Sequence, residues 1–211
     1  LLTAIGTTPT TAANPAATDL IGLWRGPWWS PGGVRLVAFK TKDPASPELV
    51  SQHLYAPSSA WGFSAPFVAQ GRVYFSHEQS EDVPVYGKYG KIDSEWRVRE
   101  FLDVIDFADP ALPTERPAIG IPGQLVGLSP DGALLYLLGS SGLAYSADWS
   151  NQKEALFACT YDGVGAYQVT SLALPKTWPR PVRVDNGNVY LGRAAADEKG
   201  THSIESWSLS D

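Results

Sequence analysis

LVAFKTKDPASP (residues 36–47) aligns without a gap with LDVIDFADPALP (residues 102–113). Each copy is an apolar run that ends in Asp-Pro-Ala-x-Pro. Proline has no N–H to give to a sheet, and an aspartate before it can accept backbone N–H groups in a turn. The pattern therefore predicts a strand that stops at Asp43 in the first copy and at Asp109 in the second.

Two weaker copies follow: LFACTYD (residues 156–162) lacks the Asp-Pro, and IESWSLSD (residues 204–211) ends where the proline would follow. Between the copies, two strands flank a tight turn at Gly71, Gly132 and Gly187, and glycine tolerates the positive φ of such turns. One unit therefore consists of a strand, a glycine turn, a strand, a connection, a strand, an Asp-Pro turn and a fourth strand, all antiparallel.

The spacing of the copies, 66, 54 and 48 residues, is typical of four-stranded propeller blades with variable loops. Residues 36–39 and 134–138 are apolar on both faces, as stacked blades require. We therefore predict an all-β fold with almost no helix. We expect residues 20–211 to form one β-propeller domain of about 3.5–4 blades, an incomplete ring that another segment or another chain would complete.

The stretch LDVIDFADPALP resembles the core of the LVIVD-type bacterial propeller repeat, and Ser129 to Gly132 (SPDG) is similar to turns of WD-like propellers. The resemblance covers residues 34–211. It implies a propeller scaffold and leaves the activity open, since such repeats serve many functions.

The charge of the chain limits its partners. A net charge of −6 and a pI near 5.0 argue against nucleic acid or an anionic membrane surface as a partner. No apolar run is long enough for a membrane-spanning helix. The single cysteine, Cys159, lies in an apolar string and is expected to be buried and inert.

Residues 1–19 are rich in Thr, Ala and Pro, which is typical of a flexible tether after a removed signal or lipoprotein peptide. This favours a secreted, periplasmic or cell-surface protein. The alternative is a scar of expression or proteolysis.

Catalytic and metal-binding motifs are not found in the sequence. The histidines, His53, His77 and His202, lack metal-ligand spacing, and no HExxH, CxxC, G-x-S-x-G or Walker pattern occurs. His77 beside Glu78 suggests an acid/base pair, but a surface histidine near a loop is the commoner situation. We therefore predict no catalytic residue, no metal and no cofactor.

Tryptophans are the first candidates for binding. Trp61 and Trp178 occupy related positions, ten and nine residues before the glycine turns at Gly71 and Gly187, and Trp28 belongs to a dense cluster near the N-terminus. Each can contact a sugar or a partner protein, or can pack against its own blade.

A long polar insertion, residues 79–95, is the second candidate. It carries Tyr86, Lys88 and Tyr89 between two strands of a blade. Long loops on rigid scaffolds often determine specificity, although a tolerated surface excursion is the alternative.

These features favour a non-catalytic exported scaffold or interaction module that binds a protein or a glycan. The alternative is a propeller subunit or fragment of an extracytoplasmic hydrolase or oxidoreductase with its site in the central channel. Such sites converge from several blades and leave little local pattern, so the sequence leaves the question open.

Overall fold

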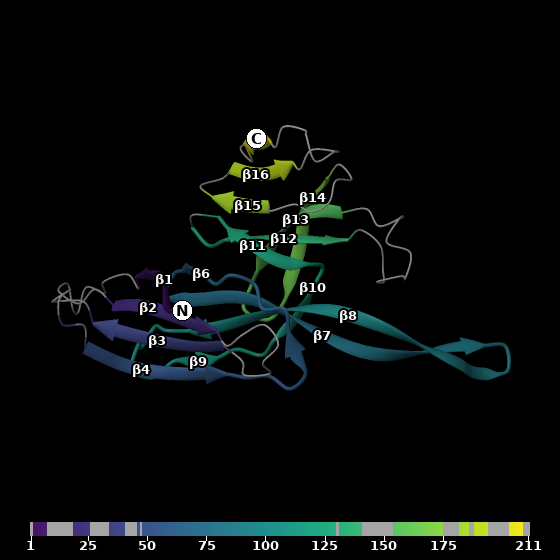
Figure 1. Ribbon diagram of the computed structural model, residues 1–211, viewed down its shortest axis with the longest axis horizontal. Helices are drawn as coiled ribbons and strands as arrows, with labels where there is room; N and C mark the ends of the chain where they lie inside the picture. The colour runs from purple at the N-terminus through teal and green to yellow at the C-terminus, as the bar shows by residue number, and fades with distance from the viewer. Residues whose placement is uncertain are drawn as a thin grey trace. The chain divides into compact units, whose positions relative to one another are not determined.

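Apolar runs broken by glycine and proline become short antiparallel strands throughout the described chain (Figure 1). The computed structural model describes residues 2–7, 19–25, 34–40, 46, 48–129, 131–140, 154–174, 182–185, 188–193 and 203–208. These residues contain strands and no helix, which confirms the all-β prediction. No helix within these ranges is long and apolar enough to cross a membrane.

The chain divides into two compact units, Leu1–Gly120 and Ile121–Asp211, whereas the sequence predicted one domain over residues 20–211. The repeated pattern marks where strands and turns occur, and it carries no information on which sheets pack together. We therefore describe each unit by itself.

The first sheet of unit 1 is an antiparallel meander in chain order. Its strands are β1 (Leu2–Thr7), β2 (Asp19–Arg25), β3 (Val34–Lys40) and β4 (Glu48–Tyr55). Residues 2–7 were predicted to belong to a flexible tether, but they pair with β2, from Leu2 opposite Trp24 to Thr7 opposite Leu20. The Thr/Ala-rich composition concealed this strand because its partner, rather than its own pattern, stabilises it.

The second sheet of unit 1 has the two longest strands of the described chain at its centre, β7 (Arg72–Gly87) and β8 (Gly90–Asp106). On the β7 side lie β5 (Ala60–Trp61) and β6 (Phe67–Ala69), and on the β8 side lie β9 (Thr114–Glu115) and β10 (Ile119–Ile121). Gln70 and Gly71 join β6 to β7 with φ values of 51° and 73°, as the glycine-turn pattern predicted.

Unit 2 contains a four-stranded and a three-stranded antiparallel sheet, again in chain order. The first consists of β11 (Gln124–Leu128), β12 (Leu134–Ser140), β13 (Glu154–Tyr161) and β14 (Ala166–Ala173). The second consists of β15 (Val182–Asp185), β16 (Asn188–Arg193) and β17 (Ser203–Ser208).

The four copies of the sequence pattern each include a strand. Leu36, Leu102 and Leu156 lie in the interior strands β3, β8 and β13, whereas Ile204 lies in β17, at the edge of its sheet. All four sheets are open, with two edges each, so the fold class that the structure supports is all-β with several antiparallel sheets.

The Asp-Pro break after β8 has the chemistry that its sequence predicts. The Asp109 carboxylate accepts a hydrogen bond from the Ala111 N–H (3.0 Å), and the Asp109 carbonyl accepts one from the Leu112 N–H (3.0 Å). The equivalent Asp43 lies outside the described residues.

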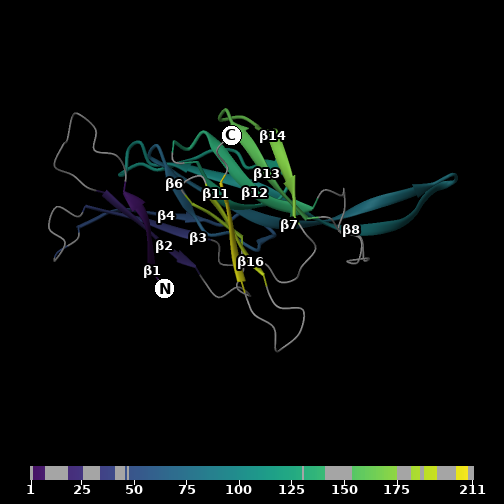
Figure 2. The same ribbon diagram turned by 90° about the horizontal axis from the view of Figure 1, so that it is seen from above.

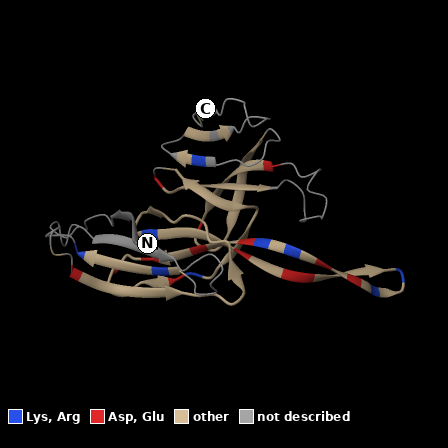
Figure 3. Cartoon of the chain, in the orientation of Figure 1, with Lys and Arg blue, Asp and Glu red and all other residues tan. Residues whose placement is uncertain are grey.

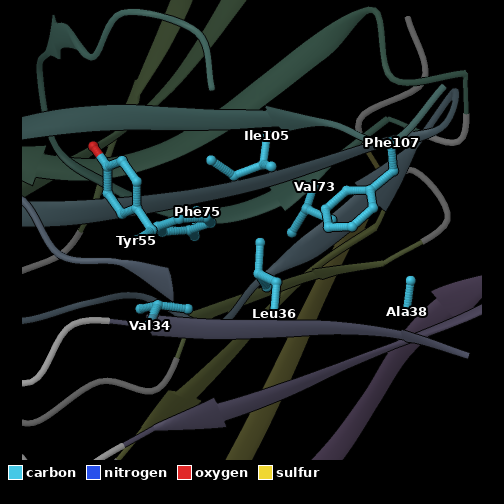
Figure 4. Close-up of a cluster of buried hydrophobic side chains, with 8 residues drawn as sticks. All are labelled: Val34, Leu36, Ala38, Tyr55, Val73, Phe75, Ile105 and Phe107. Atoms are coloured by element: carbon cyan, nitrogen blue, oxygen red, sulfur yellow. The ribbon is translucent and has the colours of Figure 1, made fainter. Parts of the chain in front are cut away.

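The core of unit 1 lies between its two sheets (Figure 4). Buried apolar side chains of β3 and of the end of β4 contact those of β7, β8 and the residue after β8; they are Val34, Leu36, Ala38, Tyr55, Val73, Phe75, Ile105 and Phe107. The two sheets thus pack face to face and exclude water from a shared apolar layer.

Unit 2 is built in the same way. Tyr136, Leu156 and Leu174, associated with its first sheet, pack with Val184 and Val189 of its second sheet. Cys159 in β13 is a buried free thiol, 1% exposed, as predicted, and burial raises its pKa.

The two sheets of unit 2 approach each other closely at Gly127. A Cβ at this position would lie 2.6 Å from Val184 Cβ and 3.0 Å from the Val184 carbonyl oxygen. We expect Gly127→Ala to cost about 1–3 kcal/mol of unfolding free energy, because a close-packed layer cannot admit a methyl group without moving backbone. Urea denaturation measures this, with Gly120→Ala as the control since a Cβ there meets nothing within 4 Å. Equal midpoints for the two variants would contradict the packing.

Candidate functional site

The hairpin of β7 and β8 continues far beyond the other strands of its sheet (Figures 1 and 2). The two strands pair from Arg72 opposite Asp106 to Gly87 opposite Gly90. The neighbouring strand β5 pairs with β7 only at Glu78 and Gln79. Beyond that point β8 is the only strand neighbour of β7 in the described part of the chain. We call residues 80–98 the ribbon.

The prediction that residues 79–95 form a loop is wrong, because most of them are strand. The segment is polar on both faces, so its period-2 alternation is weak and resembles a loop. The insertion is therefore an extension of two strands of the sheet.

The tip of the ribbon gathers three of the predicted binding residues. Tyr86 and Tyr89 are 70% and 91% exposed, and Lys88 Nζ lies 5.6 Å from the centre of the Tyr89 ring. The register shifts beside Tyr86, which leaves Ile92 unpaired and 69% exposed. The tip thus presents apolar rings and an ammonium group to solvent.

Residues that lie opposite each other on paired strands have their side chains on the same face of the sheet. The pairing register therefore assigns each side chain of the ribbon to one of two faces. Trp61 lies opposite Glu78, and Glu78 lies opposite Glu100. We call this side the tryptophan face, and we call the level of Glu78 its root. From root to tip it carries Trp61, Glu78, Glu100, Ser80, Val98, Asp82, Trp96, Pro84, Ser94, Tyr86 and Lys91.

Two indoles stand on this face. Trp61, a predicted binding residue, is 41% exposed and donates a hydrogen bond from Nε1 to Ser80 Oγ (3.1 Å). Trp96, which the sequence reasoning missed, is 52% exposed and lies opposite Asp82. Trp96 would have been found if residues 90–100 had been recognised as a strand. Residues 96 and 100 are an even number of positions apart, so they lie on the same face of that strand.

The root holds two carboxyl groups on adjacent strands. Burial and the neighbouring Glu78 carboxylate raise the pKa of Glu100 to about 8, and burial raises the pKa of Glu78. Glu100 Oε2 is buried without a hydrogen-bond partner in the described part of the chain. The raised pKa favours the protonated form of Glu100 at neutral pH.

The opposite side of the ribbon carries its arginines, each beside an acid. Arg99 pairs with Glu81, and Arg97 Nη2 lies 3.0 Å from Glu95 Oε2. Figure 3 shows the resulting alternation of basic and acidic segments along the ribbon. These exposed pairs hold the arginine side chains on their own side of the ribbon.

A buried polar group lies in the interface between the two sheets of unit 1. Tyr55 donates a hydrogen bond to Asp103 Oδ1 (2.5 Å), and His77 Nδ1 lies 2.6 Å from Asp103 Oδ2. Burial raises the pKa of Asp103, while the hydrogen bonds from His77 and Tyr55 oppose that shift. Burial and the Asp103 carboxylate also raise the pKa of Tyr55.

This group joins the sheets and is closed to substrate. His77 is 2% exposed and Asp103 is 1% exposed, and the Phe101 ring stacks on the imidazole at 5.3 Å between centroids. The prediction of a surface histidine is therefore wrong, since β7 continues through this position. A His77–Glu78 pair is also excluded, because adjacent strand residues point to opposite faces.

Two predicted binding residues, Trp28 and Trp178, lie outside the described residues. The structure thus brings Tyr86, Lys88 and Tyr89 together at the tip and places Trp61 at the root of the same ribbon. Across the ranges that the structure describes, no group of three or more His, Cys, Asp or Glu side chains could hold a metal ion.

Comparison with known proteins gives no assignment. No family model matches the chain, and no curated protein matches it at a significant level.

Proposed function

We propose that the chain is a non-catalytic interaction module of an exported β-propeller, and that it binds a protein partner through the ribbon. The observation that carries the proposal is the ribbon itself, a paired two-stranded arm whose Tyr86, Tyr89 and Trp96 side chains are mostly exposed. Exposed aromatic side chains on an ordered scaffold are typical of binding surfaces, because they bury large apolar area at little cost in conformational entropy.

The propeller part of the proposal rests on two features. The sheets follow the chain as antiparallel meanders, and within each unit two sheets pack face to face around an apolar layer. This is the packing expected of neighbouring blades, and the resemblance to LVIVD-type repeats agrees with it.

A photoreactive residue tests the function. Benzoylphenylalanine replaces Tyr89 or, as the control, Leu112, which is 70% exposed on a turn of the same unit. After irradiation in an extract of the organism that carries the gene, we expect a polypeptide adduct at position 89 and none at position 112. Equal adducts at both positions, or none at 89, would contradict the proposal. If no polypeptide adduct forms, and if the protein binds a glycan array and Trp61→Ala abolishes that binding, the partner is a glycan and not a protein.

The Glu78 and Glu100 pair favours a second candidate function, acid/base hydrolysis of a glycosidic bond. Two carboxyl groups on adjacent strands, one with its pKa raised to about 8, beside the Trp61 indole are groups that such enzymes use. Turnover of chromogenic glycosides that Glu100→Gln and Glu78→Gln each abolish would support it, and no turnover by the wild type would reject it.

A further inference from the structure

The strand β14 is an open edge of the first sheet of unit 2. Within the residues that the structure describes, β13 is its only hydrogen-bonded strand neighbour. An edge strand directs half of its backbone N–H and C=O groups away from its neighbour, and these groups must bond to water or to another strand. The free edge of β14 can therefore accept a further strand.

The sequence of β14 lacks the features that normally keep an edge unpaired. Residues 163–175 contain no charged side chain, and the only proline among them is the last residue, Pro175. Every other edge strand in the described part of the chain is shorter than β14 or carries a charged side chain. The side chains of Tyr167, Val169 and Leu172 are 57%, 61% and 38% exposed. A long, uncharged edge with exposed apolar side chains favours strand pairing.

A β-bulge determines which side chains of β14 share a face. The register with β13 shifts between Ala158 and Cys159, so Val169 is opposite no residue of β13. This extra residue moves the alternation of side chains by one position. Tyr167 and Leu172 lie opposite residues of β13 that are four positions apart, so both point to the same face, although they are themselves five positions apart.

The bulge makes the strand self-complementary. Two copies of a strand that pair antiparallel about a two-fold axis bring residues of the same face together. An axis beside Val169 places Tyr167 opposite Leu172 of the second copy, and it places Gln168 opposite Ser171 of the second copy. Each of these pairs shares a face and occurs twice. In a strand without the bulge, residues 167 and 172 would lie on opposite faces and could not be paired in this way.

The side chains that meet are suited to each other. An aromatic ring opposite an aliphatic side chain is a favourable cross-strand pair, and Gln168 and Ser171 can exchange a hydrogen bond. A strand of another protein could form the same backbone hydrogen bonds, but the matching of faces about one axis selects a second copy. Because the same strand serves both copies, the contact closes as a dimer.

We propose that β14 is a dimerisation edge, which pairs antiparallel with β14 of a second copy of this chain about a two-fold axis beside Val169. The four-stranded sheets of the two copies then join into one continuous sheet. This inference concerns unit 2 and is independent of the function proposed for the ribbon in unit 1.

Charges placed at the axis test the proposal. Sedimentation equilibrium of the full chain, from about 1 to about 200 μM at low salt, should give a dimer with a Kd in the micromolar range. Val169→Lys and Val169→Glu each bring two like charges together at the axis, so each should weaken association by about tenfold or more. An equimolar mixture of these two variants should associate to within about threefold of wild type, because lysine then meets glutamate.

A second valine of the same hairpin provides the matched control. Val164, in the turn before β14, is 80% exposed and lies outside the strand. Val164→Lys and Val164→Glu make the same changes of charge and should leave the Kd unchanged. Hydrogen exchange gives an independent readout, since the amides of residues 166–173 should exchange more slowly at about 200 μM than at about 1 μM. Circular dichroism verifies that the variants fold.

Each contrary result is decisive. A wild-type chain that stays monomeric at about 200 μM overturns the proposal, and so does a dimer that neither Val169 variant weakens. A mixture that fails to reassociate also overturns it, because the two substituted positions then do not meet at an axis. A monomeric wild type that still forms an adduct at position 89 leaves the proposed function of the ribbon standing, and a dimer through β14 without that adduct leaves only this inference standing.

Discussion

Replacing Asp103 with alanine is expected to cost about 3–5 kcal/mol of unfolding free energy, the largest effect of any change considered. Asp103 is 1% exposed and accepts hydrogen bonds from Tyr55 of one sheet and His77 of the other. Its removal leaves a buried hydroxyl and a buried imidazole N–H without their acceptor. Urea denaturation at neutral pH measures the loss.

Two further variants separate the contribution of the hydrogen bonds to the unfolding free energy from the effect of the lost side-chain volume. Tyr55→Phe keeps the ring and removes one hydrogen bond, so we expect a cost of about 1–2 kcal/mol. Glu48→Ala removes an exposed carboxylate from β4, the same strand as Tyr55, and should stay within about 0.5 kcal/mol of wild type. If Asp103→Ala behaves like Glu48→Ala, the polar group does not join the sheets.

Replacing Glu100 with glutamine is expected to stabilise the protein, increasingly so at higher pH. The pKa of Glu100 is about 8 in the folded chain against an ordinary value of 4.5. A carboxyl group with a raised folded pKa binds its proton more tightly when folded, so wild-type stability falls as pH rises from about 4.5 to about 8. Glutamine removes this penalty, and we expect a gain of about 3 kcal/mol near pH 8 and under about 1 kcal/mol near pH 5.

Thermal unfolding at several pH values checks the sign as well as the size. The difference in Tm between Glu100→Gln and wild type should widen from pH 5 to pH 8 and then level off. Glu48→Gln, which neutralises an exposed acid on β4, should leave the profile unchanged. A difference in Tm that is constant with pH would mean that Glu100 ionises normally.

The strands could be predicted wherever a breaker follows a mostly apolar run. The run LDVID stops before a turn in which Asp109 accepts backbone N–H groups, and its Leu102 to Ile105 side chains are all buried. Such local chemistry is visible in the sequence because one residue type limits one backbone conformation. The strand β1 was missed because its stability comes from pairing with β2.

The candidate site was predictable only in part. Tyr86 and Tyr89 were identified because polar insertions stand out, but their position on an extended hairpin depends on the cross-strand register. The Tyr55–Asp103–His77 group could not be found from spacing, since its partners are 48 and 26 residues apart and meet only when the sheets pack. Local pattern carries no information on such distant pairs.

The central claim is that the ribbon is the binding element, and a shortened chain tests it most directly. Replacing residues 82–96 with Asn-Gly leaves Glu81 and Arg97, which are cross-strand partners, on either side of a two-residue turn. The buried cores of both units are untouched by this change.

The measurement is competition for the adduct at position 89. An excess of unlabelled wild type should reduce the amount of photo-crosslinked adduct by at least about tenfold, whereas the same excess of the shortened chain should leave the amount unchanged. As the control for folding, the shortened chain should unfold at a temperature similar to that of the wild type. A shortened chain that competes as well as the wild type would show that binding lies elsewhere on the protein and would contradict the account.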